Sequence, residues 1–81
     1  MNYYVWLESP ADLQLLIDDE RIDSHYFNDA DCYNYPDGMI IEDNTLVMWV
    51  HDKDGTISIE AFFSRLDKNT IEYEILKNIL A

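Results

Sequence analysis

Basic residues are scarce in this chain, which has 17 Asp and Glu but only five Lys and Arg among 81 residues, for a formal net charge of -12. Residues 22–52 contain seven acids and no Lys or Arg. This imbalance excludes the basic surface by which proteins bind nucleic acids, and it disfavours attachment to anionic membranes. Repulsion among so many like charges keeps a protein soluble and monomeric, but it also destabilises the folded state.

Cysteine is nearly absent, because Cys32 is the only one. No internal disulfide is possible, so we expect a protein of the cytoplasm, or of the host cytosol if a phage encodes it. The first ten residues lack a basic segment followed by a long apolar run, and therefore predict no signal peptide. No stretch approaches the roughly 20 apolar residues that a membrane-spanning helix needs.

Glycine is equally rare, and both glycines fall in sequences typical of turns. The first turn is predicted over residues 35–38, where Pro36 restricts its own φ and Gly38 supplies a left-handed exit. The second is predicted as a hairpin turn over residues 52–55. With so few glycines, the chain also lacks the Gly-rich loop that binds phosphate groups.

The second turn resembles part of a calcium-binding loop, but the positions of the ligands do not fit. If Gly55 is the invariant sixth residue of such a loop, Val50 stands at position 1 and Ala61 at position 12. Those two positions require Asp and Glu ligands, so a hairpin is expected instead of a calcium site.

The pattern of apolar residues predicts one domain, residues 1–81, of class α+β. The expected fold is a small antiparallel sheet of about four strands with two helices, in the order β-α-loop-β-β-β-α. The predicted elements are strands over residues 3–8, 39–43, 45–51 and 56–63, helices over 9–20 and 69–81, and an ordered loop over 23–35.

Apolar side chains occupy both faces of the predicted strand 45–51. Leu46, Met48 and Val50 would share one face, while Val47 and Trp49 would share the other. Such a strand is expected in the centre of a sheet, covered on both sides.

The two helix starts differ in how clearly the sequence marks them. Ser9 as the N-cap and Pro10 at the first helical position are strong start signals for the first helix. Residues 58–67 are ambiguous, because a helix beginning at a Ser58 cap is an alternative to the strand. The pattern leaves both possibilities open.

The residue types needed for catalysis or metal binding are few and badly placed. His25, Cys32 and His51 are the only soft ligands, and their spacing is not that of a zinc site. Neighbouring acids disfavour a reactive thiolate at Cys32. A chain of this size also has little room for a deep pocket. We therefore expect no metal, no cofactor and no enzymatic activity.

The most informative stretch combines acids with tyrosines and has almost no bases. The predicted helix 9–20 ends in three consecutive acids, where the helix dipole favours cations instead. A base-free loop rich in Tyr follows, and Tyr is enriched in protein interfaces. One interpretation is a solvated surface without a partner. The other is a surface for a basic partner, formed by Asp18, Asp19, Glu20, Asp23, Tyr26, Asp29, Asp31, Tyr33, Tyr35 and Asp37.

The functional hypothesis that follows is a small acidic inhibitor or binding protein. It would cover a basic, nucleic-acid-binding surface of a partner protein, with carboxylates where phosphates normally lie. In charge and size the chain is similar to DNA-mimicking phage proteins that act against restriction enzymes or CRISPR complexes. The alternatives are an immunity protein that neutralises a cognate toxin, and an adaptor domain that inhibits nothing. We expect a monomer or a weak dimer that binds neither nucleic acid nor membranes directly.

Overall fold

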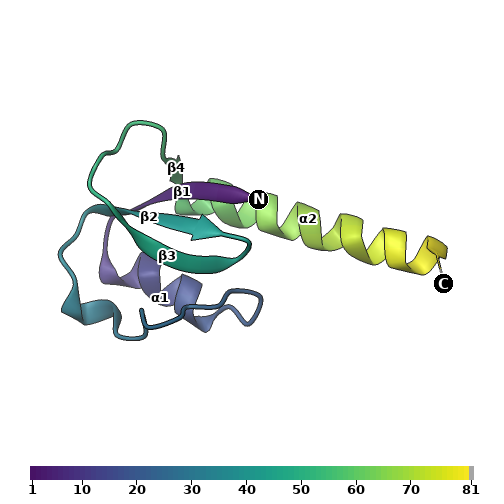
Figure 1. Ribbon diagram of the computed structural model, residues 1–81, viewed down its shortest axis with the longest axis horizontal. Coiled ribbons are helices and arrows are strands. Elements are labelled where there is room, and N and C mark those ends of the chain that lie inside the picture. The colour runs from purple at the N-terminus through teal and green to yellow at the C-terminus, as the bar shows by residue number, and fades with distance from the viewer. Residues whose placement is uncertain (81) are drawn as a thin grey trace.

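The computed structural model describes residues 1–80, which form a four-stranded sheet and two helices (Figure 1). The α+β class and the order of the strands and helices are confirmed. The spatial order of the strands is β3-β2-β1-β4. The elements are β1 (Asn2–Leu7), α1 (Pro10–Asp18), the short 3-10 turn η1 (Ala30–Cys32), β2 (Asp37–Glu42), β3 (Thr45–Val50), β4 (Ile57–Ser58) and α2 (Ile59–Leu80).

The sheet is mixed, so the prediction of an antiparallel sheet was wrong for one strand. β2 runs antiparallel to both β1 and β3, but β4 pairs in parallel with β1, with Val5 opposite Ile57. The turn at residues 52–55 therefore does not form a hairpin with β3. Instead the chain leaves β3 at one edge of the sheet and crosses to β4 at the other edge (Figure 1).

Helix α2 begins at Ile59, which corrects the predicted strand over residues 56–63. The Ser58 hydroxyl accepts a hydrogen bond from the Ala61 N–H at 3.1 Å and so caps the helix, as the alternative interpretation required. The helix predicted over residues 69–81 is, up to Leu80, the second half of this single helix, and residue 81 lies outside the described residues. No helix within residues 1–80 is long and apolar enough to cross a membrane.

Strand β3 lies at an edge of the sheet, not in its centre as predicted. A bulge changes the register, because Ile40 pairs with Met48 while Ile41 pairs with Leu46. The extra residue, Val47, puts Leu46 and the ring of Trp49 on the core side together. Met48 points away and is 53% exposed, so the predicted two-residue alternation does not hold along this strand.

Both helices pack on one face of the sheet, and the core lies between them and the strands. The ring of Tyr3 on β1 meets the ring of Phe62 on α2 edge-on, with 5.4 Å between the centroids. The opposite face, which includes Tyr4 at 49% exposure, has no helix over it. The buried apolar residues are Val5, Leu7, Leu13, Leu16, Ile22, Phe27, Ala30, Met39, Ile41, Leu46, Ile59, Phe62 and Leu66.

The chain enters and leaves β2 through two different kinds of backbone geometry. Asp43 and Asn44 both have positive φ, at 50° and 64°, which makes a two-residue hairpin turn between β2 and β3. Gly38 is already part of β2, so the predicted left-handed exit was wrong. Gly38 is needed for space instead, because a Cβ there would lie 2.6 Å from the carbonyl oxygen of Val50.

Candidate functional site

Helix α1 is shorter than predicted, and this changes the position of the three consecutive acids. The helix ends at Asp18, and Asp19 is already extended, with φ -83° and ψ 116°. Only Asp18 therefore lies in the last helical turn, where its carboxylate accepts a hydrogen bond from the Gln14 amide at 2.8 Å. Asp19 and Glu20 belong to the loop, which relieves part of the expected conflict with the helix dipole.

Asp19 is an internal partner for Arg21. The guanidinium donates to both carboxylate oxygens of Asp19, at 3.0 and 2.7 Å, and to Asp67 of α2 at 2.7 Å. These hydrogen bonds lower the pKa of Asp19 and raise the pKa of Arg21. The side chain of Asp19 is 16% exposed. Arg21 therefore joins the loop to α2, and Asp19 neutralises this base next to the acidic stretch.

The loop after Arg21 is attached to the body through buried side chains and backbone hydrogen bonds. Ile22 and Phe27 are buried in the core. Asp23 extends the edge of the sheet: its N–H donates to the Asn44 carbonyl at 2.8 Å, and its carbonyl accepts from the Leu46 N–H at 2.9 Å. One side of the loop therefore packs on the body, and its other side faces the solvent.

Trp49 on β3 is the centre of the loop's attachment. Its ring centroid lies 6.0 Å from that of Phe27, 5.1 Å from Tyr33 and 6.1 Å from Tyr35. The Tyr35 hydroxyl donates to the Ala30 carbonyl at 2.6 Å. Burial raises the pKa of Tyr35 to about 12. Tyr33 and Tyr35, both predicted to meet a partner, are thus half-buried anchors of the loop.

Asp37 also points inward, although it was predicted to lie on the partner surface. It is 8% exposed and accepts hydrogen bonds from the Gly38 N–H and from Nδ1 of His51, each at 2.9 Å. Its carboxylate is satisfied within the protein and is not available to a partner.

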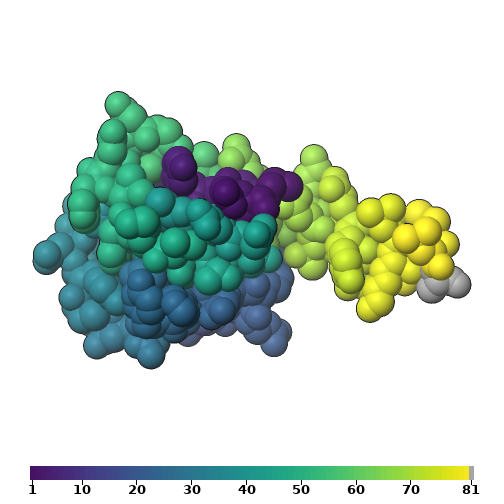
Figure 2. Space-filling view, in the orientation of Figure 1, coloured from purple at the N-terminus to yellow at the C-terminus, as the bar shows by residue number. Residues whose placement is uncertain are grey.

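The remaining predicted residues are all exposed, at the end of α1 and along the loop that follows it, and we call them together the acidic face. Tyr26 is 62% exposed and lies against His25, with 4.5 Å between the ring centroids. Within residues 1–80 none of the five exposed carboxylates on this face forms an ion pair. Residues 18–35 cover the lower side of the body in Figure 2. The acidic face consists of Asp18, Glu20, Asp23, Tyr26, Asp29 and Asp31.

Cys32 and His51 line one cavity of about 400 Å³, together with Trp49 and Asp37. The Cys32 thiol donates to the Asp29 carbonyl at 3.1 Å, so its proton is bonded to the backbone rather than to a histidine. No group of three or more His, Cys, Asp and Glu side chains within residues 1–80 is arranged to hold a metal ion. The absence of enzymatic activity stays a prediction.

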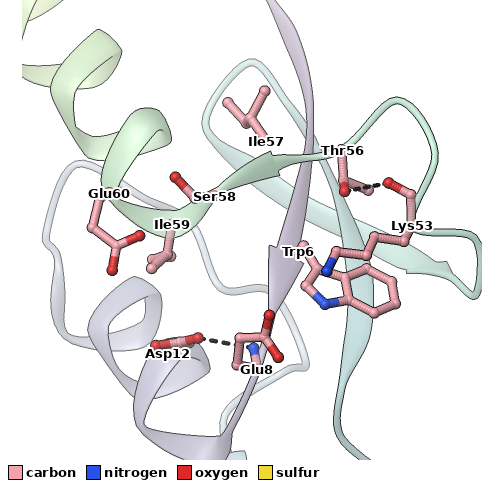
Figure 3. Close-up of a pocket in the computed structure, with 9 residues that line it drawn as sticks. All are labelled: Trp6, Glu8, Asp12, Lys53, Thr56, Ile57, Ser58, Ile59 and Glu60. Carbon is pink, nitrogen blue, oxygen red and sulfur yellow. Dashed lines mark hydrogen bonds between the residues drawn. The ribbon is translucent and has the colours of Figure 1, made fainter.

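A second cleft, which the sequence did not indicate, holds about 260 Å³ between the starts of the two helices (Figure 3). Asp12 lies in the first turn of α1, where it accepts the Glu8 N–H at 2.8 Å, and Glu60 lies in the first turn of α2. Carboxylates at these positions offset the positive ends of the helix dipoles. The Lys53 ammonium lies 5.7 Å from the centroid of the Trp6 ring. Asp12 and Glu60 therefore stabilise the starts of the two helices.

Comparison of the chain with protein-family models, with curated proteins and with solved structures finds no match in any of the three.

Proposed function

We propose that this protein binds a basic surface of another protein through its acidic face, and thereby blocks the nucleic-acid-binding site of that partner. The observation that supports the proposal is the division of the acids into two groups. Asp19 is bonded to Arg21 and the buried Asp37 is bonded to His51, whereas the five exposed carboxylates of the acidic face form no ion pair within the described residues.

Charge alone would attract a basic partner without fixing its position. Specific binding also requires that the acidic face is rigid. Its backbone is held by the sheet edge at Asp23 and by the aromatic cluster around Trp49. The carboxylates of Asp23 and Asp29 also accept local backbone N–H groups, from His25 at 2.9 Å and from Asp31 at 3.2 Å. A surface that is ordered before binding loses less conformational entropy when the complex forms.

Tyr26 supplies the anchor that acids alone lack. Tyr26 lies between Asp23 and Asp29 in the sequence. Its exposed ring contacts the ring of Phe27, with 4.6 Å between the two centroids. An Arg side chain of a partner can stack on such a ring while it bonds to a neighbouring carboxylate. Guanidinium groups that normally contact phosphates are therefore the expected ligands of this face.

The test uses two variants with the same change in net charge. Glu20→Lys/Asp31→Lys reverses two exposed acids on the acidic face that make no side-chain bond to another side chain in the described chain. Asp54→Lys/Glu72→Lys is the control, because these acids are exposed, make no side-chain bond in the described chain, and lie outside the acidic face, before β4 and on α2. Partners retained by the wild type and by the control, but lost by the first variant, are identified by affinity purification.

The decisive measurement is competition on the identified partner. The wild type should displace DNA or RNA from it, and its association rate should fall steeply with salt, since carboxylates steer the encounter. If both variants bind equally well, or if the partner binds nucleic acid undisturbed in the complex, the proposal is wrong.

A further inference from the structure

The second half of α2 is an apolar helix that projects from the body. The molecule measures 45 × 25 × 18 Å, and its long axis follows α2 past the ends of the strands (Figures 1 and 2). Every residue from 71 to 80 is exposed. Six of these ten are large apolar residues, exposed by 52% to 84%: Ile71, Tyr73, Ile75, Leu76, Ile79 and Leu80. We call residues 71–80 the projecting helix.

The apolar pattern of the projecting helix continues the stripe that packs on the sheet. Phe62 and Leu66 are buried against the body, and Tyr73, Leu76 and Leu80 follow on the same side of the helix. With Asn69 included, the spacing alternates between four and three residues over the whole stripe, which is the repeat of helices that pair along a seam. The stripe is thus suited to a second helix at the point where the sheet ends.

Charge identifies what kind of partner this helix can accept. Residues 1–58 hold thirteen acids and two bases, whereas residues 59–80 hold four acids and three bases. The projecting helix is therefore nearly neutral and offers little to the basic partner of the acidic face. It is also the segment where two copies of this chain repel each other least.

We propose that two copies of this protein associate through their projecting helices, packed antiparallel. This arrangement keeps the two acidic bodies at opposite ends of the helix pair. Centred between Ile75 and Leu76, it brings Lys77 of each copy level with Glu74 of the other copy, so that opposite charges meet. A parallel pair would bring like charges to the same level.

The available area indicates a weak and concentration-dependent dimer. Burying a large apolar side chain removes on the order of 100 Å² from water. Six partly exposed side chains then supply about 400 Å² per copy, below the roughly 800 Å² per partner of a standard stable interface.

The test measures the mass of the full chain by sedimentation over a range of protein and salt concentrations. The wild type should change from monomer to dimer as concentration rises, and the dimer should become stronger at high salt because repulsion between the bodies is screened. Leu76→Glu/Leu80→Glu should raise the dissociation constant at least about a hundredfold. Leu15→Glu/Met48→Glu is the matched control with the same change in net charge, because Leu15 and Met48 are 52% and 53% exposed and lie outside the projecting helix. This variant should dimerise as the wild type does.

The antiparallel arrangement of the two helices is tested separately, by reversing the charges of Lys77 and Glu74. Lys77→Glu should weaken the dimer, and adding Glu74→Lys should restore it, because opposite charges then meet again. A wild type that stays monomeric at millimolar concentration in high salt would overturn the proposal. So would a dimer that Leu76→Glu/Leu80→Glu does not weaken, which would place the contact on the open face of the sheet or elsewhere. Failure of the Lys77 and Glu74 rescue would overturn the antiparallel arrangement.

Discussion

The rings of Trp49 and Tyr33 lie 5.1 Å apart, centroid to centroid, and this contact connects an edge strand to the loop that carries the acidic face. The bulge at Val47 turns Trp49 toward the core side, where Phe27 and Tyr35 also reach its ring. The Trp49 indole thus contacts three aromatic side chains of the loop, which has little regular secondary structure. The geometry of the acidic face depends on this cluster.

The first prediction follows from that dependence. Trp49→Ala should lower the free energy of unfolding by about 3 kcal/mol, because a large ring is removed from the contact of loop and sheet. Trp49→Phe keeps an aromatic ring and should cost less. Chemical denaturation measures both values. Hydrogen exchange should show faster exchange of the loop amides in Trp49→Ala, and a loop that stays equally protected would contradict this role of Trp49.

The second prediction concerns alkaline pH and Tyr35. Its pKa is raised to about 12 by burial, above the usual 10.0, so the folded state favours the neutral phenol. The stabilising contribution is therefore complete below pH 10 and is lost as pH rises toward 12. The melting temperature of the wild type should fall as pH rises over this range, and the melting temperature of Tyr35→Phe should fall less steeply. Equal pH dependence in the two proteins would count against a buried phenol at this position.

The third prediction concerns acid pH and the ion pair of Asp19 with Arg21. The pKa of Asp19 is lowered by its hydrogen bonds to the guanidinium, so the charged form is favoured in the folded state. This contribution is present above the unfolded pKa of about 3.9 and is lost as pH falls through the lower folded value. Arg21→Gln should therefore cost about 1 kcal/mol near neutral pH, and the difference from the wild type should shrink in acid.

The fourth prediction concerns salt and the net charge of -12. Screening reduces repulsion between exposed acids, so the melting temperature should rise as sodium chloride increases toward about 0.5 M. Glu20→Lys/Asp31→Lys should melt higher than the wild type at low salt, and the gap should narrow at high salt. Flat melting curves across this range would mean that the acids of the acidic face do not repel one another appreciably.

The fifth prediction concerns Cys32, whose thiol is bonded to the Asp29 carbonyl and to no histidine. Cys32→Ser replaces the thiol donor with a hydroxyl donor at the same position, so the fold and the binding of a basic partner should both persist. Circular dichroism and the competition measurement check the two statements separately. Loss of partner binding in a folded Cys32→Ser protein would give the thiol a functional role.

The sequence by itself determined the features that depend on local chemistry. Ser9 and Pro10 mark the start of α1, and the Asp43–Asn44 turn joins two apolar strands, because these residues restrict the backbone within a few positions of themselves. Composition likewise determined the excess of acids and the lack of ligand sets for zinc or calcium. The ambiguity at residues 58–67 was also visible in the sequence, because the Ser58 cap and the alternating pattern competed there.

Tertiary structure decided the features that depend on contacts between distant residues. Whether β3 is central or at an edge depends on the crossing of the chain to β4, and no local pattern records that crossing. The same holds for the acids: Asp19 and Glu20 are adjacent in sequence, yet only Asp19 meets Arg21 and is removed from the surface. A carboxylate is available to a basic partner only if it stays exposed and no internal cation pairs with it, and the folded chain alone decides both.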